Sequence, residues 1–204
     1  VENPGGPDGP YVFTIPQPAD GVIGLEVVPG TPSIQDTLGN LFAGEAWSVR
    51  LDSVAPTIDV LNPPAGATVT SLSAVQVTFD ESVSGLSMGD LLVNGSASAT
   101  ALAGTGKGPY TFSIPKPADG TVNVELPANG TADAAGNSFA GDTWSYTLDS
   151  TGPVVASESP SRGSTVASLT QISVRFNEDA FNVEQSDLLV NGSATATNLS
   201  GSGT

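Results

Sequence analysis

Apolar and polar residues alternate with a period of two along several short segments of this chain. Four such segments lie between residues 75 and 148, and within each the apolar residues share one face of an extended strand: Val75, Val77 and Phe79; Tyr110, Phe112 and Ile114; Val122, Val124 and Leu126; Trp144, Tyr146 and Leu148. Alternation with β-branched and aromatic residues predicts strands that are buried on one face. No stretch of ten or more residues carries the period of an amphipathic helix.

Further strands are expected near residues 57–61, 90–93 and 97–102, which brings the expected number to seven. Asn94-Gly95 lies between two of them and predicts a type I′ hairpin turn, because both central residues of that turn need positive φ. Short strands separated by turns every 8 to 12 residues are typical of a sandwich. The predicted fold class is therefore all-β, an immunoglobulin-like antiparallel β-sandwich with Trp144 and Tyr110 in its core. Trp47 and Tyr11 occupy the equivalent places of the preceding copy and are expected to be core residues too, rather than exposed rings that stack on sugars.

The chain also repeats itself. PYVFTIPQPADG from Pro10 returns as PYTFSIPKPADG from Pro109. DLLVNGSASAT from Asp90 returns as DLLVNGSATAT from Asp187, and this second pair has an offset of 97 residues. A period of that length corresponds to a whole domain in tandem, because solenoid and propeller repeats are only about 20 to 50 residues long. We therefore expect the second half of a domain in residues 1–53, a complete domain in 54–150, and the first half of another in 151–204.

The segments TFDESVSGLSMGDLLVNG, GPYTFSIPKPADGTVNVELP, DAAGN and LDSTGP, in that order, resemble a bacterial Ig-like domain. The resemblance covers the whole chain, including both partial copies. It implies a tandem module of a large surface adhesin or extracellular fibre protein, and hence an extracellular or cell-surface location. One departure from this pattern is FNEDAFNVEQSDLL from Phe176. This segment lacks the Gly of TFDESVSG, and Asn177 occupies the position of Asp80.

Composition narrows the classes of function. Five Lys and Arg face 21 Asp and Glu, a formal charge of −16, which excludes the basic surface of a nucleic-acid binder and opposes docking on anionic lipid. No run of 18 apolar residues is present, so no membrane insertion is expected. Without Cys or His, disulfides, thiol chemistry and His-based catalytic triads are missing. We therefore do not expect an enzyme.

Acidic residues and Asn recur at fixed places in the repeat. Asp133 and Asn137 in DAAGN match Asp36 and Asn40 in DTLGN, and Asp52 and Asp149 occupy the links LDSVAP and LDSTGP. Oxygen-rich turns suit calcium, and the resemblance implies calcium near the interdomain linkers. The candidate ligands are Asp133, Asn137 and Asp149, and in the preceding copy Asp36, Asn40 and Asp52. The alternative is ordinary turn formation by Asp and Asn without a metal.

An odd number of antiparallel strands places the two ends of a domain at opposite poles. The two partial copies are then expected to lie at opposite ends, each exposing a hydrophobic sheet face. Each is completed either by a continuing chain or by an identical neighbouring copy, with Thr204 of one copy close to Val1 of the next. We favour the continuing chain, because the repeat passes there through a Gly-rich loop. The start at Val1, without Met, also leads us to expect a section of a longer protein.

The resulting prediction is a structural module that forms a semi-rigid rod, its copies joined end to end in a filament or adhesin stalk. The links contain proline, which removes backbone freedom. An alternative is an adhesin binding module that recognises a carbohydrate or protein ligand. A spacer domain of a larger enzyme is a third.

Overall fold

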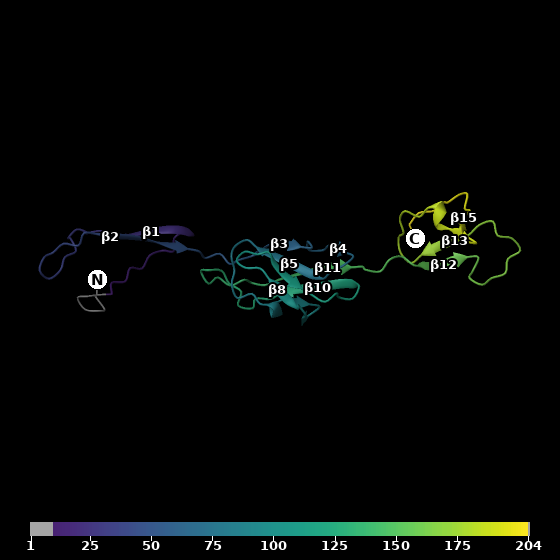
Figure 1. Ribbon diagram of the computed structural model, residues 1–204. Helices are drawn as coiled ribbons and strands as arrows, with labels where there is room; N and C mark the ends of the chain where they lie inside the picture. Colours follow the sequence, from purple (N-terminus) through teal and green to yellow (C-terminus); the bar gives the residue numbers. More distant parts are fainter. Residues whose placement is uncertain (1–9, 204) are drawn as a thin grey trace.

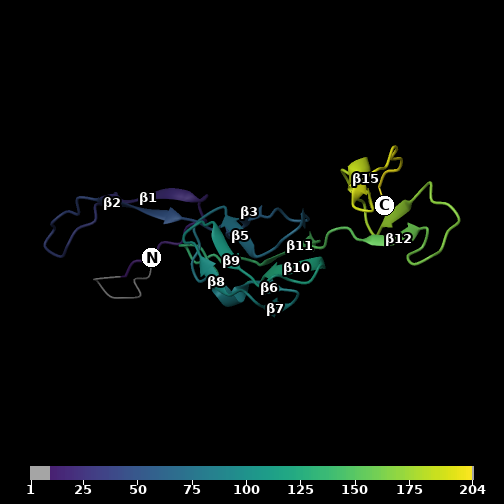
Figure 2. The same ribbon diagram turned by 45° about the vertical axis from the view of Figure 1, so that its right-hand side comes forward.

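The computed structural model describes residues 10–203, which form a central sandwich with a smaller part beyond each end (Figure 1). We call residues 10–53 the N-terminal part, 54–150 the middle domain and 151–203 the C-terminal part. The view turned by 45° shows the same order along the molecule (Figure 2). The expectation that Thr204 of one copy lies close to Val1 of the next concerns residues outside the described range.

The middle domain consists of two sheets. One has four strands in the order β3-β5-β9-β8 and the other has five in the order β4-β11-β10-β6-β7. All pairings are antiparallel except that of β4 with β11. The strands are β3 (Ile58–Asn62), β4 (Thr68–Val69), β5 (Ala74–Phe79), β6 (Leu92–Val93), β7 (Ser96–Ala97), β8 (Ala101–Ala103), β9 (Tyr110–Ser113), β10 (Gly120–Leu126) and β11 (Asp142–Leu148), with the short 3-10 helix η1 (Met88–Asp90) before β6.

The all-β sandwich predicted from the sequence is confirmed, with two differences in strand number. The structure adds β4, which is only two residues long and too short to show alternation. It also divides the strand expected at 97–102 into β7 and β8, which belong to different sheets. Among the described residues, no helix has the length and hydrophobicity needed to cross a lipid bilayer.

The core lies between the two sheets and is built from the alternating residues. All four predicted triplets are buried, and Leu72, Val83, Leu91, Val93 and Phe139 complete the cluster. The ring of Phe79 meets those of Tyr110 and Phe139 edge to face, with centroids 6.0 and 5.3 Å apart. Trp144 is 8% exposed and its Nε1–H donates to the hydroxyl of Tyr146. The prediction that these aromatic residues are core residues is confirmed for Trp144 and Tyr110. It is wrong for Trp47 and Tyr11 in the N-terminal part, which are 48% and 60% exposed, because no second sheet covers them among the described residues.

The turn predicted at Asn94-Gly95 is confirmed. Asn94 has φ 50° and Gly95 has φ 78°, as a type I′ turn requires, and the turn joins β6 to β7. The side chain of Asn94 also accepts the N–H of Asn123 on the neighbouring β10, at 2.9 Å. The same turn recurs at Asn191-Gly192 in the C-terminal part.

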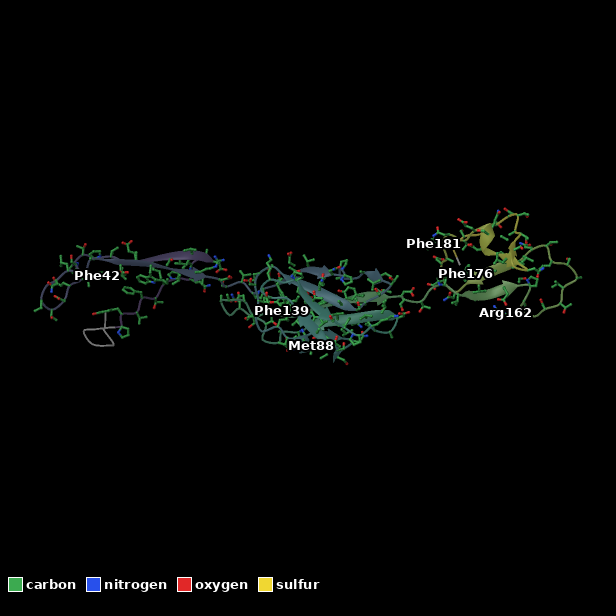
Figure 3. All side chains as sticks on the ribbon, in the orientation of Figure 1. Phe42, Met88, Phe139, Arg162, Phe176 and Phe181 are labelled. Carbon is green, nitrogen blue, oxygen red and sulfur yellow. The ribbon has the colours of Figure 1, made fainter. Side chains whose placement is uncertain are left out.

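The two smaller parts contain strand pairs that do not join into larger sheets. The N-terminal part has the hairpin β1 (Gly21–Val27) and β2 (Glu45–Leu51). The C-terminal part has β12 (Val155–Ser159) paired with β13 (Ser173–Phe176), the 3-10 helix η2 (Gln185–Asp187), and β14 (Leu189–Val190) paired with β15 (Ser193–Ala194). Neither part, as described, contributes a residue to the buried cluster. Figure 3 labels Phe42 in the N-terminal part and Phe176 in the C-terminal part.

Candidate functional site: the linkers and a carboxylate cluster

The first linker, residues 52–57, is held by side chains from both of the parts that it joins. Asp20, just before β1, accepts the N–H and the hydroxyl of Ser53, at 3.1 and 2.8 Å. Asp80, just after β5, accepts the N–H and the hydroxyl of Thr57, at 2.8 and 2.7 Å. Pro56 lies between these two contacts and is buried. The hydrogen bonds from Thr57, backbone first, lower the pKa of Asp80.

The second linker repeats this arrangement. Asp119 accepts the hydroxyls of Ser150 and Thr151, at 2.6 and 2.7 Å, and these bonds lower its pKa. On the other side, the side-chain oxygen of Asn177 accepts the N–H of Val154 at 2.7 Å. Asn177 thus preserves the backbone contact made by Asp80 in the first linker, although the residue type differs. Each linker is therefore fixed at both ends, and only residues 152 and 153 of the second lie between the two contacts.

The DAAGN motif forms a tight turn that also reaches the first linker. One carboxylate oxygen of Asp133 accepts the N–H groups of Ala135, Gly136 and Asn137, at 2.7 to 2.9 Å. The side-chain amide of Asn137 donates both to the other oxygen of Asp133, at 2.8 Å, and to the backbone carbonyl of Asp52, at 3.0 Å. Asn137 therefore connects the middle domain directly to the linker that precedes it.

This turn brings three carboxylates together. Oxygen atoms of Asp52, Glu81 and Asp133 lie within 4.8 Å of one another. Asp133 is only 5% exposed, and its hydrogen bonds, first that from the Asn137 side chain, lower its pKa. The pKa of Glu81 is raised instead, by desolvation and then by the charges of Asp133, Asp52 and Asp80. The cluster therefore concentrates negative charge between the linker and the end of the sandwich.

The donor set fits a hard divalent cation. Calcium prefers six to eight oxygen ligands from carboxylates, carbonyls and water, and three carboxylates close together supply the charged part of such a set. Asp52, Glu81 and Asp133 are the residues that would hold the ion. A bound cation would offset the repulsion that raises the pKa of Glu81 and would tie the linker to the domain.

The structure regroups the ligands expected from the sequence. The sequence predicts a calcium site formed by Asp133, Asn137 and Asp149 of the same copy. In the structure, Asp133 and Asn137 lie instead beside Asp52 of the preceding linker. The reason is that β11 carries the chain along the sandwich from the DAAGN turn to Asp149, whose N–H donates to Val69. In the N-terminal part, Asp36 and Asn40 form the same turn, with the Asn40 amide donating to Asp36 at 2.6 Å. The described residues place no linker beside that turn.

Sequence reasoning did not assign Asp20, Asp80, Asp119 or Asn177 to the linker contacts, nor Glu81 to the carboxylate cluster. A signal was available, because Asp20 and Asp119 occupy the same position of the repeated PADG segment. The pairing of Asp20 with Ser53 spans 33 positions, however, and only the antiparallel register of β1 and β2 reveals it. Glu81 and Glu178 also recur at the same position of the repeat, but nothing in the sequence places Glu81 beside Asp133.

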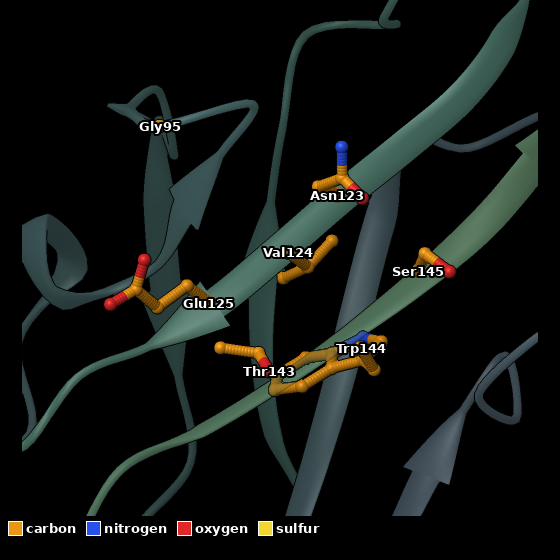
Figure 4. Close-up of a pocket in the computed structure, with 7 residues that line it drawn as sticks. All are labelled: Gly95, Asn123, Val124, Glu125, Thr143, Trp144 and Ser145. Carbon is orange, nitrogen blue, oxygen red and sulfur yellow. The ribbon is translucent and has the colours of Figure 1, made fainter.

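Elsewhere on the middle domain, the outer face of β10 and β11 carries a depression of about 350 Å³ (Figure 4). In the close-up, Asn123 and Ser145 point outward from these strands, whereas the ring of Trp144 belongs to the core. The residues around it are Gly95, Asn123, Val124, Glu125, Thr143, Trp144 and Ser145. A single carboxylate beside hydroxyl and amide groups supplies no acid–base pair for catalysis. Because Trp144 and Tyr110 are buried, neither ring is available to stack on a sugar.

Comparisons with known proteins agree with this architecture. A family model described as a bacterial Ig-like domain matches residues 52–148, the segment from the first linker to the end of β11. No curated protein and no solved structure matches the chain.

Proposed function

Because residues 52–148 belong to the bacterial Ig-like domain family, we propose that this protein is a structural module of an extracellular bacterial filament or adhesin stalk. Domains of this family occur typically in extracellular or surface proteins, and they are generally not enzymes. The finer role proposed here is mechanical: the repeats are joined by short, restrained linkers into a semi-rigid rod.

The observation that carries this proposal is the restraint of the linkers from both sides. Ser53 and Thr57 each give their N–H and hydroxyl to a carboxylate of the part on their own side of the linker. A flexible tether would leave such groups to water and would be rich in Gly and Ser. Instead, the first linker contains a buried proline, and the Asn137 amide bonds across from the middle domain to Asp52. These contacts limit the angle between successive repeats.

The stiffness of the first linker is testable by distance measurements between two spin labels. The chain has no Cys, so cysteines introduced at the exposed Ser48 on β2 and Thr121 on β10 are the only labelling sites. We expect a narrow distance distribution, because the linker is fixed at both ends. Asn137→Ala combined with Asp80→Ala removes contacts on the middle-domain side and is expected to broaden it.

The matched control for this experiment is Asn123→Ala, which removes the same kind of side chain from the middle of β10. It should leave the distribution narrow. A broad distribution in the unmodified chain would contradict the rod, since the linker contacts would then not restrain the repeats in solution.

Calcium at the first linker is a second part of the proposal, supported by the approach of three carboxylates within 4.8 Å. A ligand that binds only the folded state stabilises it by about 2.7 kcal/mol at a hundred times its dissociation constant. We therefore expect calcium to raise the melting temperature relative to a chelator. Glu81→Gln should abolish this increase, whereas Glu125→Gln, on the outer face of β10, should not. An unchanged melting temperature with calcium would overturn the metal site and leave the linker contacts intact.

Recognition of a carbohydrate or protein remains the alternative function. The depression beside Asn123 offers amide, hydroxyl and carboxylate groups, but its one aromatic residue is turned into the core. Nothing there matches the exposed aromatic platform that sugar binding favours, so the structural role is preferred.

A further inference from the structure

The strand pairs of the middle domain fall into two classes when they are compared with the outer parts. Residues 151–203 match middle-domain residues 97 positions earlier, and residues 11–27 match residues 110–126. These matches divide the middle domain into a first half, residues 54–106, and a second half, residues 110–150. Three pairs join strands within one half: β3 with β5, β6 with β7, and β10 with β11. Four pairs join strands from different halves: β5 with β9, β9 with β8, β10 with β6, and β11 with β4.

The outer parts form every pair of the first class and, among the described residues, none of the second. β12 and β13 repeat β3 and β5, including the bulge between Val155 and Ser157, and β14 and β15 repeat β6 and β7. β1 and β2 pair in the register of β10 and β11, with Gly21 opposite Leu51 as Gly120 is opposite Leu148. The bridge between Ala180 and Gly203 likewise repeats that between Val83 and Gly106. Each outer part therefore already has the local geometry of half a sandwich.

The strands that the outer parts lack are those whose partners lie in the other half. The residues that match β9, at 11–14, form no strand, and neither do those that match β4 and β8, at 165–166 and 198–200. In the middle domain β9 pairs only with β5 and β8, and β4 only with β11. What each outer part is missing is thus what the other one carries.

Hydrophobic side chains that are buried in the middle domain are exposed in both outer parts; in the C-terminal part Val174 is 44% exposed, whereas its counterpart Val77 is fully buried. Phe13 is 76% exposed, whereas its counterpart Phe112 is fully buried, and Trp47 is 48% exposed against 8% for Trp144. In the middle domain, Phe79 packs against Phe139 and Tyr110. Their counterparts are Phe176 in the C-terminal part and Phe42 and Tyr11 in the N-terminal part. Figure 3 shows Phe42 and Phe176 at opposite ends of the molecule.

We infer that copies of this chain also join head to tail, the second of the two arrangements that the sequence leaves open, with the C-terminal part of one copy and the N-terminal part of the next forming one complete sandwich. This inference deepens the proposed function by naming the partner, a second copy of the same chain. The middle domain identifies this occupant, because it shows which strands cover each exposed face. Continuous sheets would form across the joint, as in recognition by strand addition.

The register of the joint follows from the middle domain. Residues 11–14 of one copy would enter the sheet beside β13 of the other, with Phe13 opposite Ile172 as Phe112 is opposite Val75. β1 would pair with β14, as β10 pairs with β6. The hydroxyl of Tyr11 would then donate to the carbonyls of Ala180 and Gly203, as Tyr110 donates to those of Val83 and Gly106 at 3.2 and 2.9 Å.

Burial of apolar surface, rather than charge attraction, would drive this association. Residues 10–53 contain five acidic and one basic residue, and residues 151–203 contain five acidic and two basic residues, so both surfaces are negative. Salt screens such repulsion, and association should strengthen as the salt concentration rises. Because the two surfaces lie at opposite ends of the molecule (Figure 1), each joint leaves one free end of each kind, and an open polymer results unless the copies close into a ring.

Sedimentation at increasing protein concentration tests the inference with a closely matched pair of variants. Phe13 and Val12 are neighbours with nearly equal exposure, 76% and 79%. Only Phe13 would enter the core of the joint, because Val12 matches Thr111 on the outer face of β9. Phe13→Asp should weaken association at least about a hundredfold, since it would bury an unpaired charge. Val12→Asp should associate like the unmodified chain.

A mixing experiment distinguishes specific association of the two surfaces from nonspecific aggregation. Phe13→Asp blocks one surface and Phe176→Asp blocks the other, so each variant alone should remain a monomer of 20.4 kDa. An equimolar mixture should give a particle of twice that mass and no larger species, because only one joint is then available. The melting of the middle domain should be unchanged in both variants.

Three results would overturn the inference: a monomer at every concentration of the unmodified chain, equal loss of association with Val12→Asp and Phe13→Asp, or a mixture that stays monomeric. None of these results would contradict the proposed rod, because the stiffness of the linker can be measured separately in the monomeric Phe13→Asp chain.

Discussion

The middle domain and the two outer parts are copies of one repeated sequence, yet their side chains have different surroundings. β10 and β11 form a hairpin whose inner residues are buried, whereas β1 and β2 form the same hairpin in the same register with the equivalent residues only half-buried or exposed. The comparison separates two levels of the fold. Hairpins and short strand pairs form from neighbouring sequence, but a core forms only where the second layer is present.

The two Asp-Asn turns show the same difference between local structure and tertiary contact. Asp133 and Asn137 form a turn that Asp36 and Asn40 reproduce almost bond for bond. Only in the middle domain does the turn have a linker beside it, so only Asn137 bonds to a carbonyl of that linker. Hydrogen bonds within the motif form the turn, and the contact with the linker exists only because the neighbouring repeat places Asp52 there.

The largest expected difference between the regions concerns a matched pair of phenylalanines. Phe112→Ala should reduce the free energy of unfolding of the middle domain by about 3–5 kcal/mol, because it leaves a cavity between the sheets. Phe13→Ala, at the equivalent exposed position, should change it by no more than about 0.5 kcal/mol. Chemical denaturation in dilute solution measures both. Similar losses for the two variants would mean that the N-terminal part is packed against the middle domain.

A smaller effect is expected from a buried hydroxyl that only the middle domain has. The hydroxyl of Tyr146 accepts the Trp144 Nε1–H and donates to the carbonyl of Pro63, both at 2.9 Å. Tyr146→Phe leaves both partners unsatisfied and should cost about 1–3 kcal/mol of unfolding free energy. The N-terminal part has Val49 at this position. A neutral result would show that water reaches Trp144 and Pro63, and that this end of the core is open.

The smallest effects are expected from pH. The pKa values of Asp80, Asp119 and Asp133 are lowered in the folded protein, chiefly by hydrogen bonds from Thr57, Ser150 and Asn137 respectively. Their contribution to stability is present above their ordinary pKa and is lost as the pH falls through the lowered values, so stability should decline below about pH 4.

Glu81 titrates with the opposite sign. Its raised pKa means that folding is disfavoured as the pH rises through that value and the carboxyl ionises beside Asp133 and Asp52. Without calcium, Glu81→Gln should therefore stabilise the middle domain near pH 7 and have little effect near pH 3. Thermal melting across this range checks the sign. A destabilised variant at pH 7 would mean that the Glu81 carboxylate has a favourable partner in solution.

Much of the middle domain was predictable because its strands alternate and its turns carry their own chemistry. The inner faces of β5, β9, β10 and β11, and the turn at Asn94-Gly95, follow from period-two patterning and from the need for positive φ. β4 was not predictable, because a two-residue strand has no period and exists through its pairing with β11. The carboxylate cluster was only half predictable: Asp52 and Asp133 were named, but not that they meet.

The sequence by itself determined the alternation, the hairpin registers and the turn chemistry, because these depend on residues close together along the chain. Only the tertiary structure decided which strands pair across halves, which linker residue each carboxylate holds, and that Glu81 joins Asp52 and Asp133. Except for the pairing of β8 with β9, which are neighbours in the chain, those contacts join positions far apart in the sequence, up to 85 residues for Asn137 and Asp52, and no local preference selects among them. They form only when two layers of strands close over a shared apolar interior.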